Sequence, residues 1–391
     1  MALFRSFFQA GFEGATGYNR HGEWIDQIAA TEHDLFADED YQRLREAGLL
    51  TVREAVRWPL VDRNRDYDFS SLEPFLAAGA KHGIEIIHDL FHFGYPAHID
   101  LFSADFPRRF ADYCFAVADY LARQTPGVIY FTPVNEPSFF SWAAGEVGLF
   151  APHAVGRGWE LKVQLIEAAI QGINAIRAAC PLARIVNADP LCRVTAPPGR
   201  ADLRDEVEYF NTKVVFQSWD MLCGRLMPEL GGSPQHLDIV GINYYWTNQW
   251  EWGRAGGPLG SDDPRRVCLS ELVHSVWLRY GHEMLITETS QVSESRAAWL
   301  RELADEAKTM LDEGLQLHGI CLYPILGMPE WHARHEWTQM GLWELRNGSG
   351  RLERVLHEPM MEALREAQWL EEHPRRTVQQ NFREIGTSEG A

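Results

Sequence analysis

Two glutamates in distant parts of this chain each follow an apolar, strand-like run. Glu136 ends the segment that begins at Val128, and Glu288 follows Glu283-Met-Leu-Ile-Thr. In a barrel of parallel strands, residues at the C-terminal ends of the strands point into the active site. Two such carboxylates could face each other across a bound sugar, which is the arrangement that a retaining glycosidase needs.

Each glutamate alone is a weak signal. Glu136 lies in Asn-Glu-Pro, and a proline often only ends a strand. Glu288 follows a run that an ordinary buried strand would also show. The pair is more informative than either member, because further segments of the chain agree with it.

The chain alternates short β-type runs with amphipathic helical stretches, a pattern typical of parallel βα units. We expect a single α/β domain, a (β/α)8 TIM barrel over residues 1–372, followed by a polar tail at 373–391. The expected strands are Phe7–Phe12, Leu50–Val56, Ile84–Leu90, Val128–Val134, Arg184–Ala188, Leu237–Tyr244, Glu283–Thr287 and Leu317–Tyr323. Expected helices include Glu39–Ala47, Leu72–His82, Pro107–Arg123, Leu161–Ala179 and Ser295–Glu313.

Composition narrows the classes of function. A formal charge of −19 argues against nucleic acid or an anionic membrane as a partner, since both require a basic surface. The six cysteines have no CxxC spacing, so we expect buried free thiols and no disulfide framework. No leader peptide or membrane-length apolar run is recognisable, so we expect a cytoplasmic enzyme. The sequence indicates no oligomeric state.

Several segments resemble glycoside hydrolase family 1, the β-glucosidase and β-galactosidase family of the retaining (β/α)8 clan. The similarity runs from about Phe7 to Leu345, and the motifs occur in the family's order. Besides the two glutamate segments, the matching motifs are Gly48-Leu-Leu-Thr-Val-Arg53-Glu-Ala-Val-Arg-Trp58-Pro59, Asp89-Leu-Phe-His92-Phe-Gly-Tyr-Pro96, Gly241-Ile-Asn243-Tyr-Tyr245 and Gly319 through Pro329-Glu330-Trp331.

The resemblance implies a role for each residue that matches. Glu136 would be the general acid/base and must be protonated at rest. Glu288 would be the nucleophile, kept ionised by Arg53 and Tyr245. Asn135 would bind the sugar 2-hydroxyl. The glycone's other hydroxyls and face would be bound by His92, Glu330, Trp331 and Tyr323, with Asn243 supporting the catalytic groups.

The supporting residues also have structural explanations. Arg53 could pair with Glu54 or Asp89, and Tyr245 could be a core aromatic. Asn243 could satisfy loop backbone, and His92 could be an ordinary buried histidine.

A metal site is the rival interpretation of one segment, which contains His88, Asp89, His92 and His98. The i,i+4 spacing of His88 and His92 suits a helix. This run is predicted to be a strand entering a loop, where that spacing does not align side chains. His332 and His335 are a weaker candidate pair. We therefore expect no metal and no cofactor.

Three departures from the family pattern concern sugar recognition. Gly11 occupies the position of the usual strand-one glutamine, and Gln9 or Glu13 are open as substitutes. Tyr323, followed by Pro324, stands where the family has a tryptophan followed by serine. Gly94 and Tyr95 replace an aspartate of the strand-three loop.

These features predict a retaining β-glycosidase that acts on a terminal glucoside-like or galactoside-like sugar by double displacement. Two alternatives stay open. One is a glycosidase or transglycosidase of the same clan with another glycone. The other is a non-catalytic sugar-binding protein on the same scaffold, since a fold alone does not fix a function.

Overall fold

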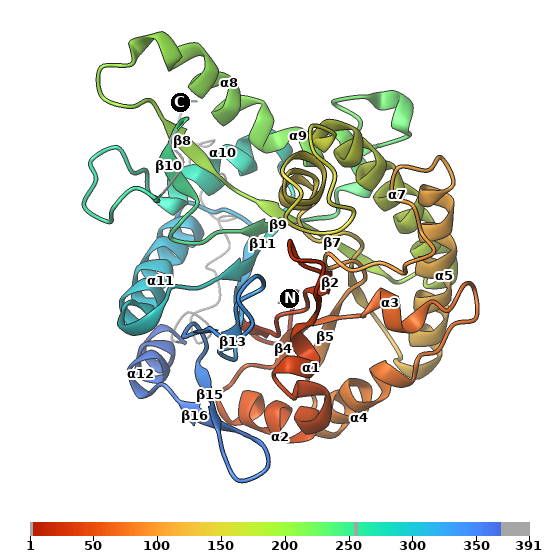
Figure 1. Cartoon of the computed structure of the whole chain (residues 1–391). Helices are drawn as coiled ribbons and strands as arrows, with labels where there is room; N and C mark the ends of the chain where they lie inside the picture. The colour runs from red at the N-terminus through yellow and green to blue at the C-terminus, as the bar shows by residue number, and fades with distance from the viewer. Residues whose placement is uncertain (1–2, 254–256, 369–391) are drawn as a thin grey trace, which may run out of the picture.

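The computed structural model describes residues 3–253 and 257–368, and eight parallel strands form a closed barrel at its centre (Figure 1). Around the barrel the strands follow one another in chain order, and the last pairs with the first. All eight expected strands are present, with ends within two residues of the expected ones. They are β1 (Phe8–Gly11), β4 (Thr51–Ala55), β5 (Glu85–Asp89), β6 (Tyr130–Thr132), β7 (Arg184–Pro190), β9 (Ile239–Asn243), β11 (Glu283–Thr289) and β12 (Leu317–Leu322).

Helices surround the barrel and connect its strands (Figure 1). The five expected helices are confirmed as α2 (His33–Glu46), α4 (Glu73–His82), α5 (Phe106–Gln124), α7 (Gly158–Ala179) and α11 (Arg296–Asp312). The expected start of α2 at Glu39 is wrong, because a first turn from His33 joins the helix across a kink at Phe36. The remaining helices are α1 (Gln27–Ala30), α3 (Trp58–Val61), α6 (Pro137–Phe140), α8 (Arg204–Thr212), α9 (Gln217–Leu222), α10 (Leu269–Tyr280) and α12 (Glu358–Ala367).

Short strands outside the barrel decorate the loops. Four small sheets pair β2 with β3, β8 with β10, β13 with β14, and β15 with β16. Their bounds are β2 (Thr16–Tyr18), β3 (Trp24–Asp26), β8 (Arg193–Thr195), β10 (Gln249–Glu251), β13 (Met328–Pro329), β14 (Trp337–Thr338), β15 (Trp343–Asn347) and β16 (Leu352–Leu356). Most of these pairs follow the C-terminal ends of barrel strands, where active-site loops belong in this architecture.

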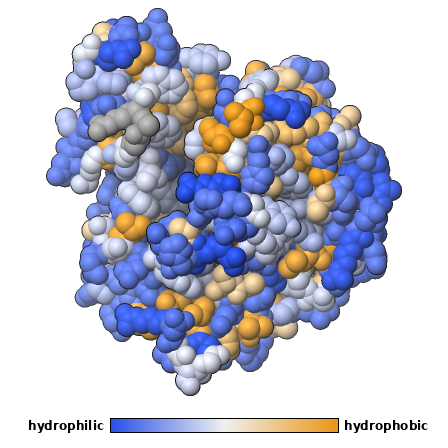
Figure 2. All heavy atoms as spheres, in the orientation of Figure 1, coloured by the Kyte–Doolittle hydropathy of each residue, from blue (hydrophilic) through white to orange (hydrophobic). Residues whose placement is uncertain are grey.

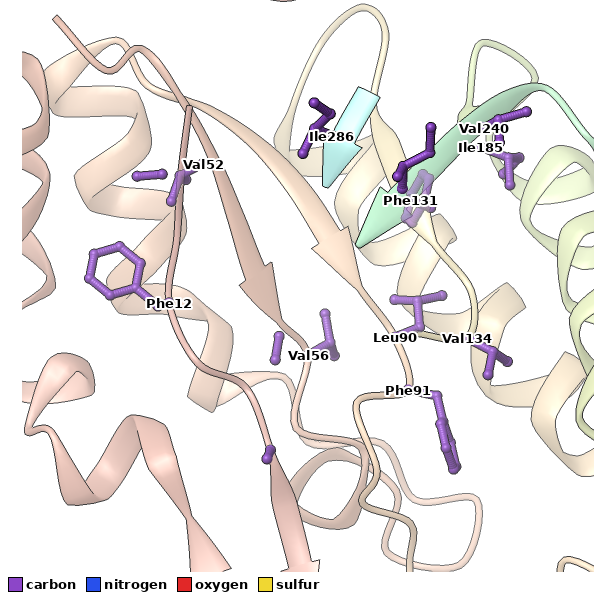
Figure 3. Packing of buried hydrophobic residues seen from close by; sticks show 14 of the residues in the cluster. Phe12, Val52, Val56, Leu90, Phe91, Phe131, Val134, Ile185, Val240 and Ile286 are labelled. Atoms are coloured by element: carbon purple, nitrogen blue, oxygen red, sulfur yellow. The ribbon is translucent and has the colours of Figure 1, made fainter. Parts of the chain in front are cut away.

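The core has two parts. A large apolar cluster fills the space between the barrel and its helices, and Figure 3 shows some of its members. A smaller cluster lies near the starts of the strands and consists of Phe4, Ile87, Tyr130, Val186, Ile239 and Leu285. The ends of the strands carry polar side chains instead. Apolar residues therefore fill one end of the barrel, and polar side chains gather at the other end.

The structure also bears on the expectations about membrane helices, cysteines and the C-terminal tail. In the described ranges, no helix is long and apolar enough to cross a bilayer. The six cysteines are free thiols, and four of them are buried; Cys192 is half-buried, and Cys268 is exposed, contrary to expectation. The visible face carries mostly hydrophilic residues with separate hydrophobic groups (Figure 2). The proposed boundary at 372 and the tail 373–391 lie outside the described residues.

Candidate active site

The two glutamates lie in the polar end of the barrel. Glu136 follows β6 and immediately precedes α6, whereas Glu288 is the second-last residue of β11. Both are buried, with exposed fractions of 8% and 4%. Burial and the nearby charge of Glu288 raise the pKa of Glu136 well above its usual range. This direction of the shift favours the protonated form of Glu136, which a general acid requires.

Glu136 is held in an unusual backbone conformation. Its φ of +49° lies in the left-handed region, which a residue with a side chain adopts at a cost. The Glu136 N–H donates to the Ala188 carbonyl at the end of β7, at 2.9 Å. The side-chain amide of Asn243 donates to Glu136 Oε1, also at 2.9 Å. These contacts orient the carboxyl group without giving it a cationic partner.

Glu288 has the opposite surroundings. Arg53 Nη1 donates to its Oε1 at 2.9 Å, and the Tyr245 hydroxyl donates to its Oε2 at 2.8 Å. Burial, followed by the charges of Glu288 and Glu136, raises the pKa of Tyr245 well above its usual range, so the phenol keeps its proton. Charge-assisted hydrogen bonds to both oxygens favour the carboxylate form of Glu288.

Arg53 connects most of the site. Its guanidinium also donates to the Thr287 carbonyl (2.9 Å), to Asp89 Oδ2 (2.7 Å) and to Asn135 Oδ1 (3.1 Å). Arg53 therefore pairs with Asp89, as the structural alternative predicted, and it also contacts Glu288. The alternative pair with Glu54 is wrong, because neighbouring residues of a strand point to opposite faces.

His92 completes this network on the β5 side. Its Nδ1 lies 2.9 Å from Asp89 Oδ2, and its Nε2 lies 3.3 Å from Asn135 Nδ2 and 3.5 Å from Glu13 Oε1. Burial lowers the pKa of His92, but the charges of Asp89, Glu13 and Glu288 outweigh burial and raise it to about 9. His92 is thus a buried cation that faces three carboxylates.

The strand-one departure has a steric explanation. A Cβ atom at Gly11 would lie 2.2 Å from Cδ2 of Tyr323, so the tyrosine ring fills the space that a side chain at position 11 would need. The Gly14 N–H donates to the Tyr323 hydroxyl at 3.0 Å, and the ring stacks on His92. Tyr323 is only 2% exposed. Its ring is part of the packed floor of the site.

Of the two candidate substitutes for the missing glutamine, Glu13 is the one beside the site. Gln9 is fully buried in β1, and its amide has no hydrogen-bond partner among the described residues. Glu13 Oε1 accepts the Ala15 N–H at 2.8 Å. Burial raises the pKa of Glu13 to about 7, with His92 lowering it and Glu288 raising it. A third carboxyl group therefore lies near His92 and Glu288.

Glu330 and Trp331 lie apart from this network. Glu330 is exposed and accepts a hydrogen bond from the Thr338 hydroxyl. The Trp331 ring packs against Phe93, Phe139 and Phe150, near the segments that carry His92 and Glu136. Their contact with a glycone stays a prediction.

Comparison with known proteins identifies the architecture. The sequence matches no family model and no curated protein. Among solved structures, it resembles the AHE enzyme from Alicyclobacillus herbarius, with a TM-score of 0.76 and 17% identity over 96% of this chain and 100% of that chain. The family 1 β-glucosidase from Thermotoga maritima in complex with isofagomine lactam gives a TM-score of 0.75 and 14% identity, over 93% and 98%. The fold is that of the family 1 β-glucosidases.

The β-glucosidase fold explains why the predicted residues converge although the identity is low. Arg53, Asn135 and Glu288 come from separate strands or the loops after them, and the barrel brings them into hydrogen-bond contact. Another departure from the family pattern is also steric, since a Cβ atom at Gly94 would lie 2.1 Å from the Thr16 carbonyl oxygen. The substitutions thus change the walls of the site and leave its carboxylates in contact with Arg53 and Asn243.

The rival metal cluster does not assemble in the described part of the chain, where no group of three or more His, Cys, Asp or Glu side chains is arranged to hold an ion. His88 is buried against Phe131, and burial lowers its pKa to about 3. His98 contacts Arg109 near the surface, and His335 is exposed. Of this group, only Asp89 and His92 belong to the site in the described part of the chain.

Sequence reasoning did not assign Asp89 and Asp189 a place in the site. Asp89 ends β5 and bridges Arg53 and His92. Asp189 lies near the end of β7 and contacts the turn that carries Glu136. The available signal was their position, since each is an acidic residue near the C-terminal end of a barrel strand.

Proposed function

We propose that this protein is a retaining β-glycosidase. The observation that carries the proposal is the contrast between two buried glutamates in one site. Glu136 has a neutral amide donor, no cationic hydrogen-bond partner among the described residues, and a raised pKa. Glu288 has both oxygens bound, one by an arginine and one by a tyrosine. Two carboxyl groups whose surroundings favour opposite protonation states are the acid and nucleophile of this reaction class.

The first half of the reaction forms a covalent intermediate. A carboxylate oxygen of Glu288 attacks the anomeric carbon, and the bond from that carbon to the leaving oxygen breaks. Glu136 gives its proton to the leaving oxygen and becomes a carboxylate. The product is an ester between the sugar and Glu288, and the aglycone departs as an alcohol.

The second half restores the enzyme. Ionised Glu136 takes a proton from a water molecule whose oxygen attacks the anomeric carbon. The ester bond to Glu288 breaks, which regenerates the carboxylate, and the sugar leaves with its original β configuration. Only side chains and water take part in these two steps, so the proposal requires no metal or cofactor.

The remaining residues suit a neutral sugar with several hydroxyl groups. Asn135 lies between Arg53 and His92, and in this proposal it binds the 2-hydroxyl next to the reacting carbon. Glu13 and His92 supply an acceptor and a donor for the outer hydroxyls. The surplus of carboxylates disfavours a glycone that carries its own negative charge. We therefore propose a glucoside-like or galactoside-like substrate.

The proposed function is tested by turnover of activated aryl β-glycosides by wild type and Glu288→Ala, with and without azide. We expect the kcat/KM of the variant to fall at least about a thousand-fold, because the variant has no carboxylate to form the covalent intermediate with the sugar. Azide should restore turnover and give an α-glycosyl azide, and the sugar that supports rescue identifies the glycone.

Glu283→Ala is the matched control, since Glu283 starts the same strand and pairs with Arg184 at the opposite end of the barrel. Its kcat/KM should remain close to that of wild type. Turnover by Glu288→Ala equal to that of wild type would contradict the mechanism. No turnover of any glycoside by folded wild type would favour the sugar-binding alternative.

A further inference from the structure

Two consecutive residues at the end of β7 accept hydrogen bonds from the turn that carries Glu136. The Ala188 carbonyl accepts the Glu136 N–H at 2.9 Å. The next residue, Asp189, accepts the Ser138 N–H at its Oδ1 (2.9 Å) and the Ser138 hydroxyl at its Oδ2 (2.6 Å). Both oxygens of Asp189 therefore hold the first turn of α6, and Glu136, in the left-handed conformation, is the residue immediately before that helix.

Asp189 is built into a buried polar cluster. It is 1% exposed, and the Ser138 hydroxyl that it accepts also lies 2.8 Å from the hydroxyl of Ser218, which is fully buried. Lys162 of α7 adds a buried positive charge and donates to Gln217. Burial raises the pKa of Asp189 to about 6, while the Ser138 hydrogen bonds and the Lys162 charge lower it. Asp189 is thus largely a buried carboxylate at pH 7.

Glu136 is faced by charged groups from several elements. Glu288 on β11 and Asp189 on β7 are negative, and His92 after β5 is positive. Arg53 adds a positive charge that is bound to Glu288 and Asp89. Asn243 on β9 is a neutral donor, and Tyr245 and Cys192 are neutral groups whose pKa values are raised partly by the charge of Glu136. Asp189 is the negative group of this set that does not react.

We propose that Asp189 is a positioning residue for the acid/base glutamate: it fixes the Glu136 turn through Ser138 and supplies a buried negative charge near Glu136 that the reaction does not consume. This inference rests on the proposed function. Because Asp189 contacts Glu136 through the backbone turn and through its charge, it does not touch the reacting atoms.

The permanence of this charge matters in the second half of the reaction. Once Glu288 forms the ester, its negative charge is gone, and Glu136 must then accept a proton from water. Asp189 keeps its charge in both states. It therefore maintains the basicity of Glu136 when the other carboxylate no longer does so.

The test is Asp189→Asn, which preserves the shape of the side chain and removes the charge. We expect the alkaline limb of the pH profile of kcat/KM to move down by about half a unit to one unit, because removal of a negative neighbour lowers the pKa of Glu136. Alkyl glycosides, whose leaving groups need a proton, should lose about three- to ten-fold on the alkaline side of that limb. Activated aryl glycosides should lose less than about three-fold in kcat/KM.

Azide separates the base role from a general loss of structure. With an activated substrate, water attack on the glycosyl-enzyme should be slowed in Asp189→Asn, and azide should restore the rate because it needs no base. Ser138→Ala is the matched control. It keeps the carboxyl group of Asp189 and removes one of the hydrogen bonds that lower its pKa, so its alkaline limb should move less than that of Asp189→Asn.

A uniform loss at every pH and for every leaving group would overturn the proposal and leave Asp189 a purely structural residue. If Asp189→Asn does not fold, Asp189→Ser removes the same charge with a smaller side chain. NMR titration of 13C-labelled glutamate carboxyls, with Glu136 assigned from Glu136→Gln, supplies a readout that needs no turnover. An inactive wild type would remove the proposed function, whereas an unchanged Glu136 titration in Asp189→Asn would remove this inference alone.

Discussion

Adjacent residues of β4 enter two different buried networks. Arg53 points into the barrel and binds Glu288, Asp89 and Asn135. Glu54 points outward and accepts hydrogen bonds at Oε1 from His33 and Tyr41 of α2, both at 2.8 Å. The outer network continues from His33 to Asp40, which in turn binds Arg354 of β16.

The two networks differ in their balance of charge. Among the buried groups of the outer network, two carboxylates, Glu54 and Asp40, meet two cations, Arg354 and His33. The carboxylates raise the pKa of His33 to about 9 against the effect of burial, and the partly exposed Arg43 also pairs with Asp40. In the inner network the cations are Arg53 and His92, and the carboxyl groups are Glu13, Asp89, Glu136 and Glu288. The balanced charges of the outer network join α2 to the β15–β16 hairpin. The surplus of carboxyl groups in the inner network contributes to the raised pKa of Glu136, which the proposed acid/base role requires.

The sharpest test of this contrast is Arg53→Lys. A lysine cannot reach Glu288, Asp89, Asn135 and the Thr287 carbonyl with one ammonium group, so the nucleophile should lose its fixed geometry. We expect kcat/KM for an activated aryl β-glycoside to fall about 100- to 1,000-fold while the circular dichroism spectrum stays that of a folded protein.

Glu54→Gln is the partner variant on the same strand. It should lower the free energy of unfolding and leave kcat/KM per folded molecule within about two-fold, because its contacts lie outside the barrel. Equal losses of activity in the two variants would show that the networks are one functional unit, and the comparison would fail.

The sequence was sufficient to predict the barrel and the position of two glutamates at its polar end for a simple reason. Short apolar runs that end in a polar residue mark both a strand and the end of that strand that faces the site, as Glu136 and Glu288 illustrate. The start of α2 was not predicted, since its first turn is defined by His33 binding Glu54, which lies 21 residues away.

Long-range steric relations were equally invisible in the sequence. Gly11 reads as a lost glutamine until the ring of Tyr323, more than 300 residues later, is found in its place. Asp189 follows the expected strand Arg184–Ala188 and received no role, because its relation to Glu136 depends on Ser138, 51 residues earlier. The local sequence pattern identifies the strands and the acidic residues at their ends. The protonation of these acidic residues depends on neighbours that are distant in the sequence and that only the fold brings close.

The outer network predicts a specific pH dependence of stability. A histidine whose folded pKa is about 9, against 6.5 in the unfolded chain, stabilises the fold fully below pH 6.5 and loses this contribution as the pH rises to 9. We expect His33→Gln to be about 3 kcal/mol less stable than wild type at pH 6 and the difference to narrow by pH 9.5. Urea unfolding at the two pH values measures it.

Activity gives the control for His33→Gln, since kcat/KM at pH 7 should stay within about two-fold of wild type in the folded protein. A constant stability difference from pH 6 to pH 9.5 would mean that His33 is neutral in the folded state. The outer network would then not be charge-balanced, and the distinction between the two networks would disappear.

The smallest expected effect concerns Glu13, the carboxyl group that stands beside the catalytic pair. Burial raises its pKa to about 7, with His92 and Glu288 acting in opposite directions, so it is mostly neutral at pH 5.5 and mostly ionised at pH 8.5. An ionised carboxylate accepts stronger hydrogen bonds from sugar hydroxyls than an amide does. For Glu13→Gln we therefore expect kcat/KM close to wild type at pH 5.5 and about three- to ten-fold lower at pH 8.5, mainly through KM.

The pH dependence of Glu13→Gln distinguishes two roles of Glu13: binding the glycone, and raising the pKa of Glu136. If Glu13 serves only to raise the pKa of Glu136, its replacement should move the alkaline limb of kcat and leave KM unchanged. If it binds the sugar, a deoxy-glycone lacking the contacted hydroxyl should erase the difference between wild type and Glu13→Gln at pH 8.5. An effect that is independent of both pH and glycone would place Glu13 with the residues that only build the wall of the site, because the Ala15 N–H would then be its main partner.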